Sequence, residues 1–250
     1  MLSYFDTPQP RLLAHRGLAQ RSGLDENTIP AFLEALEFGA THLESDTQAT
    51  KDGHALLLHD SDLSRVAGID AAVEELTLEQ VSQIRLANGG QIPTLAQALR
   101  ELPEAKFNID VKTRAAIEPT VRAIEQANAH ERVLLSSFSN PIRRKSLSGL
   151  SRSVATSASQ SIVIAAYLSH KILLGLGFGR IVRDVHAFQI PTAKGPINFA
   201  DPAFIRRLQL HQTEVHFWTI NNPQEAKKLI AMGADGIVSD RVDLMNLRET

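Results

Sequence analysis

The stretch Leu12-Leu13-Ala14-His15-Arg16-Gly17 is a short apolar run that ends in two basic residues and a glycine. Such a run predicts a buried strand, over residues 11–14, that leads into a turn. Further runs of this kind predict strands over residues 42–48, 55–58, 106–112, 133–138, 153–157, 187–190, 214–220 and 236–238. Helices are predicted between them, over residues 29–39, 76–86, 94–102, 115–127, 141–150, 161–175, 202–210 and 224–232. Asp25 or Asn27 is expected to cap the first of these helices.

This alternation of strand and helix predicts an α/β protein with a parallel sheet and helical crossovers. A chain of 250 residues suits a (β/α)8 TIM barrel, and we expect one domain over residues 1–250. Nine strands are one too many for such a barrel. The turn signal Lys51-Asp52-Gly53 accounts for the surplus, because it predicts that residues 55–58 fold back as a hairpin strand. A doubly wound open sheet is the alternative, weakened by the lack of a Gly-x-Gly-x-x-Gly motif after the first strand.

Composition excludes several classes of protein. The net charge of −2 does not favour a nucleic-acid binder, and the lack of cysteine excludes disulfides and thiolate metal sites. Residues 1–10 lack the basic and apolar regions of a signal peptide, so a cytoplasmic location is expected. The apolar segment 161–178 is interrupted by polar residues, so we interpret it as a helix of the core or of a contact between copies, without stable membrane insertion.

Polar residues are concentrated where the predicted strands end, and barrel active sites are built at that end. Glu44 and Asp46 are two residues apart, so on a strand they point to one side, as do Asp110 and Lys112. A tight hairpin would bring His59 beside the first acidic pair. Together with His15 and Arg16, these residues are suited to phosphate-ester chemistry on a metal ion.

An ordered set of motifs resembles the glycerophosphodiester phosphodiesterase family over nearly the whole chain. The motifs are His15-Arg16-Gly17, Glu26-Asn27-Thr28, Glu44-Ser45-Asp46, Thr50-Lys51-Asp52-Gly53, His59-Asp60, Asn108-Ile109-Asp110-Val111-Lys112, Ser137-Phe138, Trp218-Thr219-Ile220-Asn221 and Gly233-Ala234-Asp235-Gly236-Ile237-Val238-Ser239-Asp240. The resemblance implies a barrel enzyme that uses one divalent cation to hydrolyse glycerophosphodiesters to glycerol 3-phosphate and an alcohol.

The resemblance also implies roles for single residues. It implies that His15 and His59 are the acid and base, and that Glu44, Asp46 and Asp110 hold the cation. Three carboxylates favour a hard ion, and Mg²⁺ and Ca²⁺ both remain open. Arg16 and Lys112 match positions that contact the phosphate, and Trp218 matches an aromatic wall of the pocket.

The sequence departs from the family pattern at two points. Asp110 stands where the family usually has glutamate, and residues 61–106 leave room for only a small insertion after the second histidine. Two further functions therefore stay open: a lysophospholipase D or sphingomyelinase D-like activity, with segment 161–178 forming an apolar groove, and a phosphate-binding barrel without catalysis.

Overall fold

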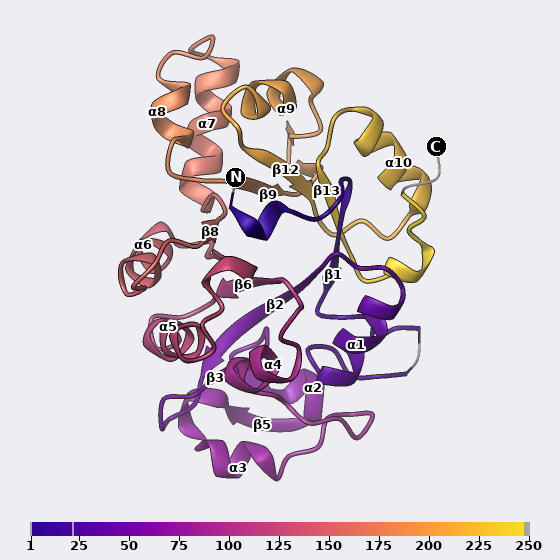
Figure 1. Cartoon of the computed structure of the whole chain (residues 1–250), viewed down its shortest axis with the longest axis vertical. Coiled ribbons are helices and arrows are strands. Elements are labelled where there is room, and N and C mark those ends of the chain that lie inside the picture. Colours follow the sequence, from indigo (N-terminus) through magenta and orange to yellow (C-terminus); the bar gives the residue numbers. More distant parts are fainter. Residues whose placement is uncertain (1, 22, 248–250) are drawn as a thin grey trace.

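The computed structural model describes residues 2–21 and 23–247, and eight parallel strands of these residues form a barrel (Figure 1). Their order around the barrel is β8, β7, β6, β2, β1, β13, β12 and β9. The strands span Arg11–His15 (β1), His42–Ala49 (β2), Phe107–Val111 (β6), Val133–Ser136 (β7), Ala155–Thr156 (β8), Ala187–Ile190 (β9), Glu214–Phe217 (β12) and Gly236–Ser239 (β13).

Strands β8 and β9 stand at the two ends of this order, and the barrel closes between them. An isolated parallel bridge joins Ser157 to Ala187. Two backbone hydrogen bonds flank it, from the His186 amide to the Thr156 carbonyl at 2.8 Å and from the Ala158 amide to the Ala187 carbonyl at 2.9 Å. The predicted (β/α)8 barrel is therefore confirmed, and the open doubly wound sheet is not.

The ninth predicted strand is the hairpin strand β3 (Ala55–Leu57), which pairs antiparallel with β2. After His59 the chain forms a small insertion with its own apolar cluster, built around Leu56, Leu63 and Val81. The insertion contains β4 (Asp62–Leu63), α2 (Ser64–Ala67), β5 (Ile69–Ala72), a 3-10 turn (Val73–Glu75) and α3 (Leu78–Ser82). The helix expected over residues 76–86 is thus only five residues long.

Helices surround the barrel and bury one apolar face each against the strands. They are α1 (Ile29–Glu37), α4 (Leu95–Glu101), α5 (Ile117–Gln126), α6 (Asn140–Ser148), α7 (Gln160–Lys171), α8 (Phe178–Val182), α9 (Pro202–Gln209) and α10 (Pro223–Ala231). A two-stranded ribbon, β10 (Ala193–Lys194) and β11 (Ile197–Asn198), follows β9. None of the described helices combines the length and apolarity needed to cross a membrane.

Two expectations about helix ends are wrong. The cap of α1 is Thr28, whose hydroxyl accepts from the Ala31 amide, and neither Asp25 nor Asn27 takes this position. Thr28 has the extended backbone of a cap residue, whereas Asn27 lies in the left-handed region (φ +58°). Helix α7 ends at Lys171, four residues before the expected end, because Leu174 and Gly175 also adopt left-handed conformations.

The amino end of the barrel is filled by a buried polar network. The Arg11 guanidinium donates to the Glu214 carboxylate at 2.6 and 2.7 Å. The His42 ring lies 3.0 Å from the Tyr4 carbonyl and 2.8 Å from the Thr41 hydroxyl. The short 3-10 turn Ser3–Phe5 covers this end, so the carboxyl ends of the strands are left to form a site.

Candidate active site

The first loop of the site is shaped by the turn after β1. Gly17 has a φ of +83°, and a Cβ at this position would lie 2.8 Å from the Ala31 backbone. Glycine is therefore required for the close approach of this loop to α1. The Asn27 amide donates to the Arg16 carbonyl at 2.9 Å, and its side-chain oxygen accepts from Ser45 at 2.7 Å. These bonds hold Arg16 over the end of β2.

His15 ends β1 and is fixed by Asp240, which follows β13. The ring nitrogen Nδ1 donates to the Asp240 carboxylate at 2.6 Å, and Nε2 lies 3.9 Å from the Glu44 carboxylate. Burial lowers the pKa of His15, but the hydrogen bond to Asp240 and the charge of Glu44 outweigh burial and leave that pKa raised. His15 therefore presents Nε2 to the interior of the site.

His59, which lies just after the hairpin strand β3, is paired with an aspartate in the same way as His15. Its Nδ1 lies 2.7 Å from the Asp60 carboxylate, and Asp60 also accepts from Arg65 at 2.5 Å. Burial raises the pKa of Asp60, but its bonds to His59 and Arg65 outweigh burial and lower it. Two histidine–aspartate pairs thus face one cavity, each with Nε2 left free of the aspartate.

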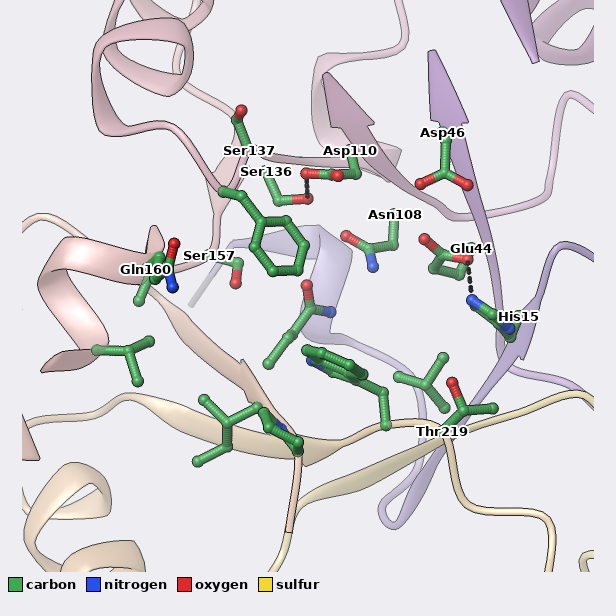
Figure 2. Close-up of a pocket in the computed structure, with 18 of the residues that line it drawn as sticks. His15, Glu44, Asp46, Asn108, Asp110, Ser136, Ser137, Ser157, Gln160 and Thr219 are labelled. Atoms are coloured by element: carbon green, nitrogen blue, oxygen red, sulfur yellow. Dashed lines mark hydrogen bonds and ion pairs between the residues drawn. The ribbon is translucent and has the colours of Figure 1, made fainter. Parts of the chain in front are cut away.

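Three carboxylates lie on the two neighbouring strands β2 and β6. Asp46 stands directly beside Asp110 in the sheet, and Glu44 stands beside Asn108. Figure 2 shows these four side chains along one side of the pocket, with His15 next to Glu44. Burial, and then the nearby charge of Asp46, raise the pKa of Glu44 to about 8. Burial also raises the pKa of Asp110, although Lys112 opposes this.

Two basic side chains lie among these carboxylates. The Lys112 ammonium is 2.6 Å from Asp46 and 2.7 Å from Asp110, so it bridges the two. Burial lowers the pKa of Lys112, but both carboxylates outweigh burial and raise it. The Arg16 guanidinium reaches Glu26 at 3.2 Å and lies 3.5 Å from Asp46. Its Nε is buried with no hydrogen-bond partner among the described residues.

The donor set fits a hard divalent cation in its chemistry. Glu44 Oε2, Asp46 Oδ2 and Asn108 Oδ1 are buried oxygens without a hydrogen-bond partner in the part of the chain that the structure describes. Buried acceptors of this kind are stabilised by a cation. No three acidic or histidine side chains of the described residues converge for metal binding, and the Lys112 ammonium takes the place between Asp46 and Asp110. A cation held by all three predicted carboxylates therefore requires this ammonium to move.

The cavity in front of these groups has a volume of about 550 Å³. Its other side is largely apolar and comes from the second half of the chain, which also contributes Ser157, Gln160, Gln189 and Lys194. The apolar residues are Phe138, Val163, Ile164, Ile190, Ile197, Phe199 and Trp218. Phe138 and Trp218 meet edge to face, with ring centroids 6.1 Å apart. The polar side chains that residues 15–112 contribute to the cavity thus face a wall made by residues 138–218 (Figure 2).

The structure brings together all eight residues that the sequence predicts for the site, since each of them lines this cavity. Sequence reasoning assigned no role to Asp240, Asp60 or Asn108, although all three lie in the motifs quoted above. The position of Asp240 after the last strand was the available signal, because first and last strands are neighbours in a closed barrel. Glu26 and Ser137 mainly stabilise the loops, through Arg65 at 2.7 Å and the Val111 carbonyl at 2.7 Å respectively.

Comparison with known proteins agrees with this geometry. The chain is 39% identical over 234 residues to a Mycobacterium tuberculosis protein named "Probable glycerophosphodiester phosphodiesterase 2", covering 93% of this chain and 88% of that protein. It is 26% identical to a glycerophosphodiester phosphodiesterase of Caldanaerobacter subterraneus, covering 94% and 96%.

A solved structure has the same fold. The crystal structure of an Oleispira antarctica phosphodiesterase in complex with its product sn-glycerol-3-phosphate matches with a TM-score of 0.76 at 23% identity, covering 96% of each chain. A model of the "Glycerophosphoryl diester phosphodiesterase family" matches residues 15–244. The chain therefore belongs to the glycerophosphoryl diester phosphodiesterase family, a family of phosphoric diester hydrolases.

Proposed function

We propose that this enzyme hydrolyses glycerophosphodiesters to sn-glycerol 3-phosphate and an alcohol. The observation that carries the proposal is the pair of histidines, each oriented by an aspartate, that faces one cavity beside three carboxylates and two basic side chains. The product complex of the Oleispira antarctica relative supports the same substrate class.

Acid and base are supplied by His15 and His59. With Nδ1 donating to an aspartate, a neutral imidazole has an acceptor at Nε2, and a protonated one has a donor there. One histidine takes the proton from the glycerol 2-hydroxyl, whose oxygen attacks phosphorus, and the other gives a proton to the departing alcohol oxygen. Water then opens the cyclic phosphate. Each such proton transfer contributes roughly 10²- to 10⁴-fold in rate.

Phosphate binding is assigned to Arg16 and Lys112. The unpartnered Nε of Arg16 and the ammonium of Lys112 both lie at the carboxylate side of the cavity. A guanidinium suits two-point recognition of phosphate oxygens, and an ammonium adds a point charge. Glu44, Asp46 and Asp110 would hold one Mg²⁺ or Ca²⁺, which when bound polarises the phosphoryl oxygens and stabilises negative charge in the transition state.

The alcohol side of the substrate is assigned to the apolar wall that contains Trp218 and Phe138. This wall also favours a second candidate function, a lysophospholipase D or sphingomyelinase D-like reaction, because Val163, Ile164 and Phe199 extend it toward helix α7. An acyl chain is a ligand that such an apolar surface accommodates.

The test is release of glycerol 3-phosphate from glycerophosphocholine, measured with chelator, with Mg²⁺ and with Ca²⁺, and compared with a lysolipid substrate. Cation-dependent release that is lost in His15→Ala is the expected result. Faster turnover of the lysolipid would favour the second candidate. Binding of the diester without any product would identify a binding barrel, and full turnover of an analogue without the 2-hydroxyl would exclude the cyclic route.

A further inference from the structure

An apolar surface runs outward from the rim of the active-site cavity along helix α7. Ile164 lines the cavity and is 46% exposed, and Leu168 and Ile172 follow it at intervals of four residues, on one face of the helix. The loop after α7 continues this face. We call the following residues the apolar ridge: Ile164, Leu168, Ile172, Leu173, Leu174 and Leu176.

The tip of the apolar ridge is held away from the core. Leu174 is 86% exposed and Leu176 is 78% exposed. Leu174 also has a φ of +52°, a left-handed conformation that is unfavourable for a leucine. The Gly175 amide donates to the Ser169 carbonyl at 2.7 Å, and the Ser169 hydroxyl donates to the Leu176 carbonyl at 2.9 Å. The fold therefore fixes the loop in a shape that presents leucines to the surroundings.

The charge of the chain is distributed unevenly around this ridge. Residues 141–212 contain ten lysine and arginine residues but only two acidic ones, Asp184 and Asp201, which gives a net charge of +8. The rest of the chain then carries −10, because the whole chain carries −2. Helices α7, α8 and α9 belong to the basic segment and lie at the same end of the molecule (Figure 1).

Basic side chains lie directly beside the ridge. Lys171 ends α7 and pairs with Asp201 at 2.6 Å, and Arg180 is an exposed residue of α8. Arg207 lies against Gly175, and its Nη1 is buried and has no hydrogen-bond partner among the described residues. At the cavity rim, Lys194 of the β10–β11 ribbon is exposed and lines the cavity. An apolar ridge bordered by cations is complementary to an anionic lipid surface, where side chains enter the acyl region and cations meet the head groups.

We propose that the apolar ridge docks this enzyme on the surface of an anionic lipid bilayer. Contact between two copies of the chain is a weaker explanation, because a symmetric contact would place the same basic segment against itself. Docking through Ile164 turns the mouth of the cavity toward the lipid. The value of this orientation rests on the proposed function, because it would bring diesters in the bilayer, or released from it, to the active site.

The test is flotation of the full-length protein with vesicles of phosphatidylcholine alone and of phosphatidylcholine with phosphatidylglycerol. We expect binding to the anionic vesicles only, weakened by salt, and roughly tenfold weaker binding in the double variant Leu174→Asn and Leu176→Ser. Asparagine tolerates the left-handed conformation at position 174, so the fold is retained.

A matched pair of single variants controls for the loss of any exposed leucine. Leu173 and Leu33 are 53% and 52% exposed, and Leu33 lies on α1, outside the ridge. Leu173→Ser is expected to weaken vesicle binding and Leu33→Ser to leave it unchanged. Equal binding by wild type and Leu173→Ser would overturn the proposal. The proposal would also be overturned if the wild-type protein bound no vesicles and sedimented as a dimer that dissociates in Leu173→Ser.

Hydrolysis of glycerophosphocholine without vesicles separates this proposal from the proposed function. The ridge variants are expected to retain it in full. An inactive protein that still binds anionic vesicles through the ridge would disprove the proposed function alone. An active protein that binds no vesicles would disprove docking alone.

Discussion

His15 and Asp240 join the first and the last strand of the barrel through a 2.6 Å hydrogen bond from Nδ1 to the carboxylate. The bond fixes which ring nitrogen carries the proton in the neutral histidine. Nε2 is then directed toward Glu44 and the cavity, where it can take or give a proton. Asp240 is thus a positioning residue for His15.

Asp240→Asn should lower the pKa of His15, because an amide does not stabilise the imidazolium by charge. We expect kcat to fall roughly tenfold or more, and the limb of the kcat/KM profile that His15 controls to move to lower pH: the acid limb if His15 is the base, the basic limb if it is the acid. Asp243→Asn is the control, since Asp243 pairs with Arg241 and does not line the cavity. A profile in which neither limb shifts in Asp240→Asn would contradict the role of Asp240.

His15→Ala and His59→Ala should each reduce glycerol 3-phosphate release by roughly 10²- to 10⁴-fold, because each removes one proton-transfer group. His54→Ala is the matched control: the His54 side chain is 48% exposed and does not line the cavity. Thermal unfolding of the three variants checks that the fold is retained. If either cavity variant kept wild-type rates, that histidine would have no part in proton transfer.

Lys112→Met leaves Asp46 and Asp110 without their shared ammonium, although their side chains are only 3% and 8% exposed. We expect the free energy of unfolding, measured by urea titration with chelator, to fall by about 3–5 kcal/mol. Added Mg²⁺ or Ca²⁺ should restore much of this loss, because a cation can replace the ammonium between the carboxylates. A variant that is as stable as wild type in chelator would rule out this compensation of charge.

Cation binding should become tighter as pH rises through about 8. The pKa of Glu44 is raised to about 8, so this carboxyl group is protonated below that pH, and a cation must displace the proton. We expect calorimetric titrations with Mg²⁺ or Ca²⁺ to show proton release and an affinity that increases by up to about tenfold per pH unit below 8. Glu44→Gln should remove most of this dependence on pH. Equal affinities at pH 6 and pH 8 would contradict it.

His42 should make the protein less stable in acid. Burial lowers its pKa from 6.5 to about 3, so the unfolded state takes up a proton at a higher pH than the folded state does. The free energy of unfolding should therefore fall by up to about 4 kcal/mol as pH falls from 6.5 to 3. His42→Gln should show a smaller fall over this range, because glutamine does not titrate. Parallel curves for the two proteins would exclude His42 as the cause.

Much of the fold could be predicted from the sequence because several barrel strands, such as β1, β7 and β13, are short apolar runs that end in a polar residue. Leu12–Ala14 and Ile237–Val238 are buried in the structure as that pattern predicts. The segment 76–86 misled the prediction, because its apolar residues pack into the separate cluster of the insertion and need only one short helix. Helix ends were also missed, since left-handed residues such as Leu174 carry no signal in their side chain.

Two pairs of site residues, Glu44 with Asp46 and Asp110 with Lys112, could be predicted because side chains two residues apart on a strand point to the same side. The contacts between distant strands were not predictable in this way. Asp240 meets His15 only because the barrel closes, and the bridge formed by Lys112 depends on the register between β2 and β6.

The cavity divides between the two halves of the chain, with the reactive groups of residues 15–112 facing an apolar wall from residues 138–218. This division makes substrate choice separable from reactivity. The wall can be exchanged, by substitution or by grafting from a relative, while the histidines, carboxylates and basic residues keep their places on β1, β2 and β6 and in the segments that follow β1, β3 and β6. Under the proposed assignment of this wall to the alcohol, substitutions in the second half would change alcohol preference and leave the reactive groups in place.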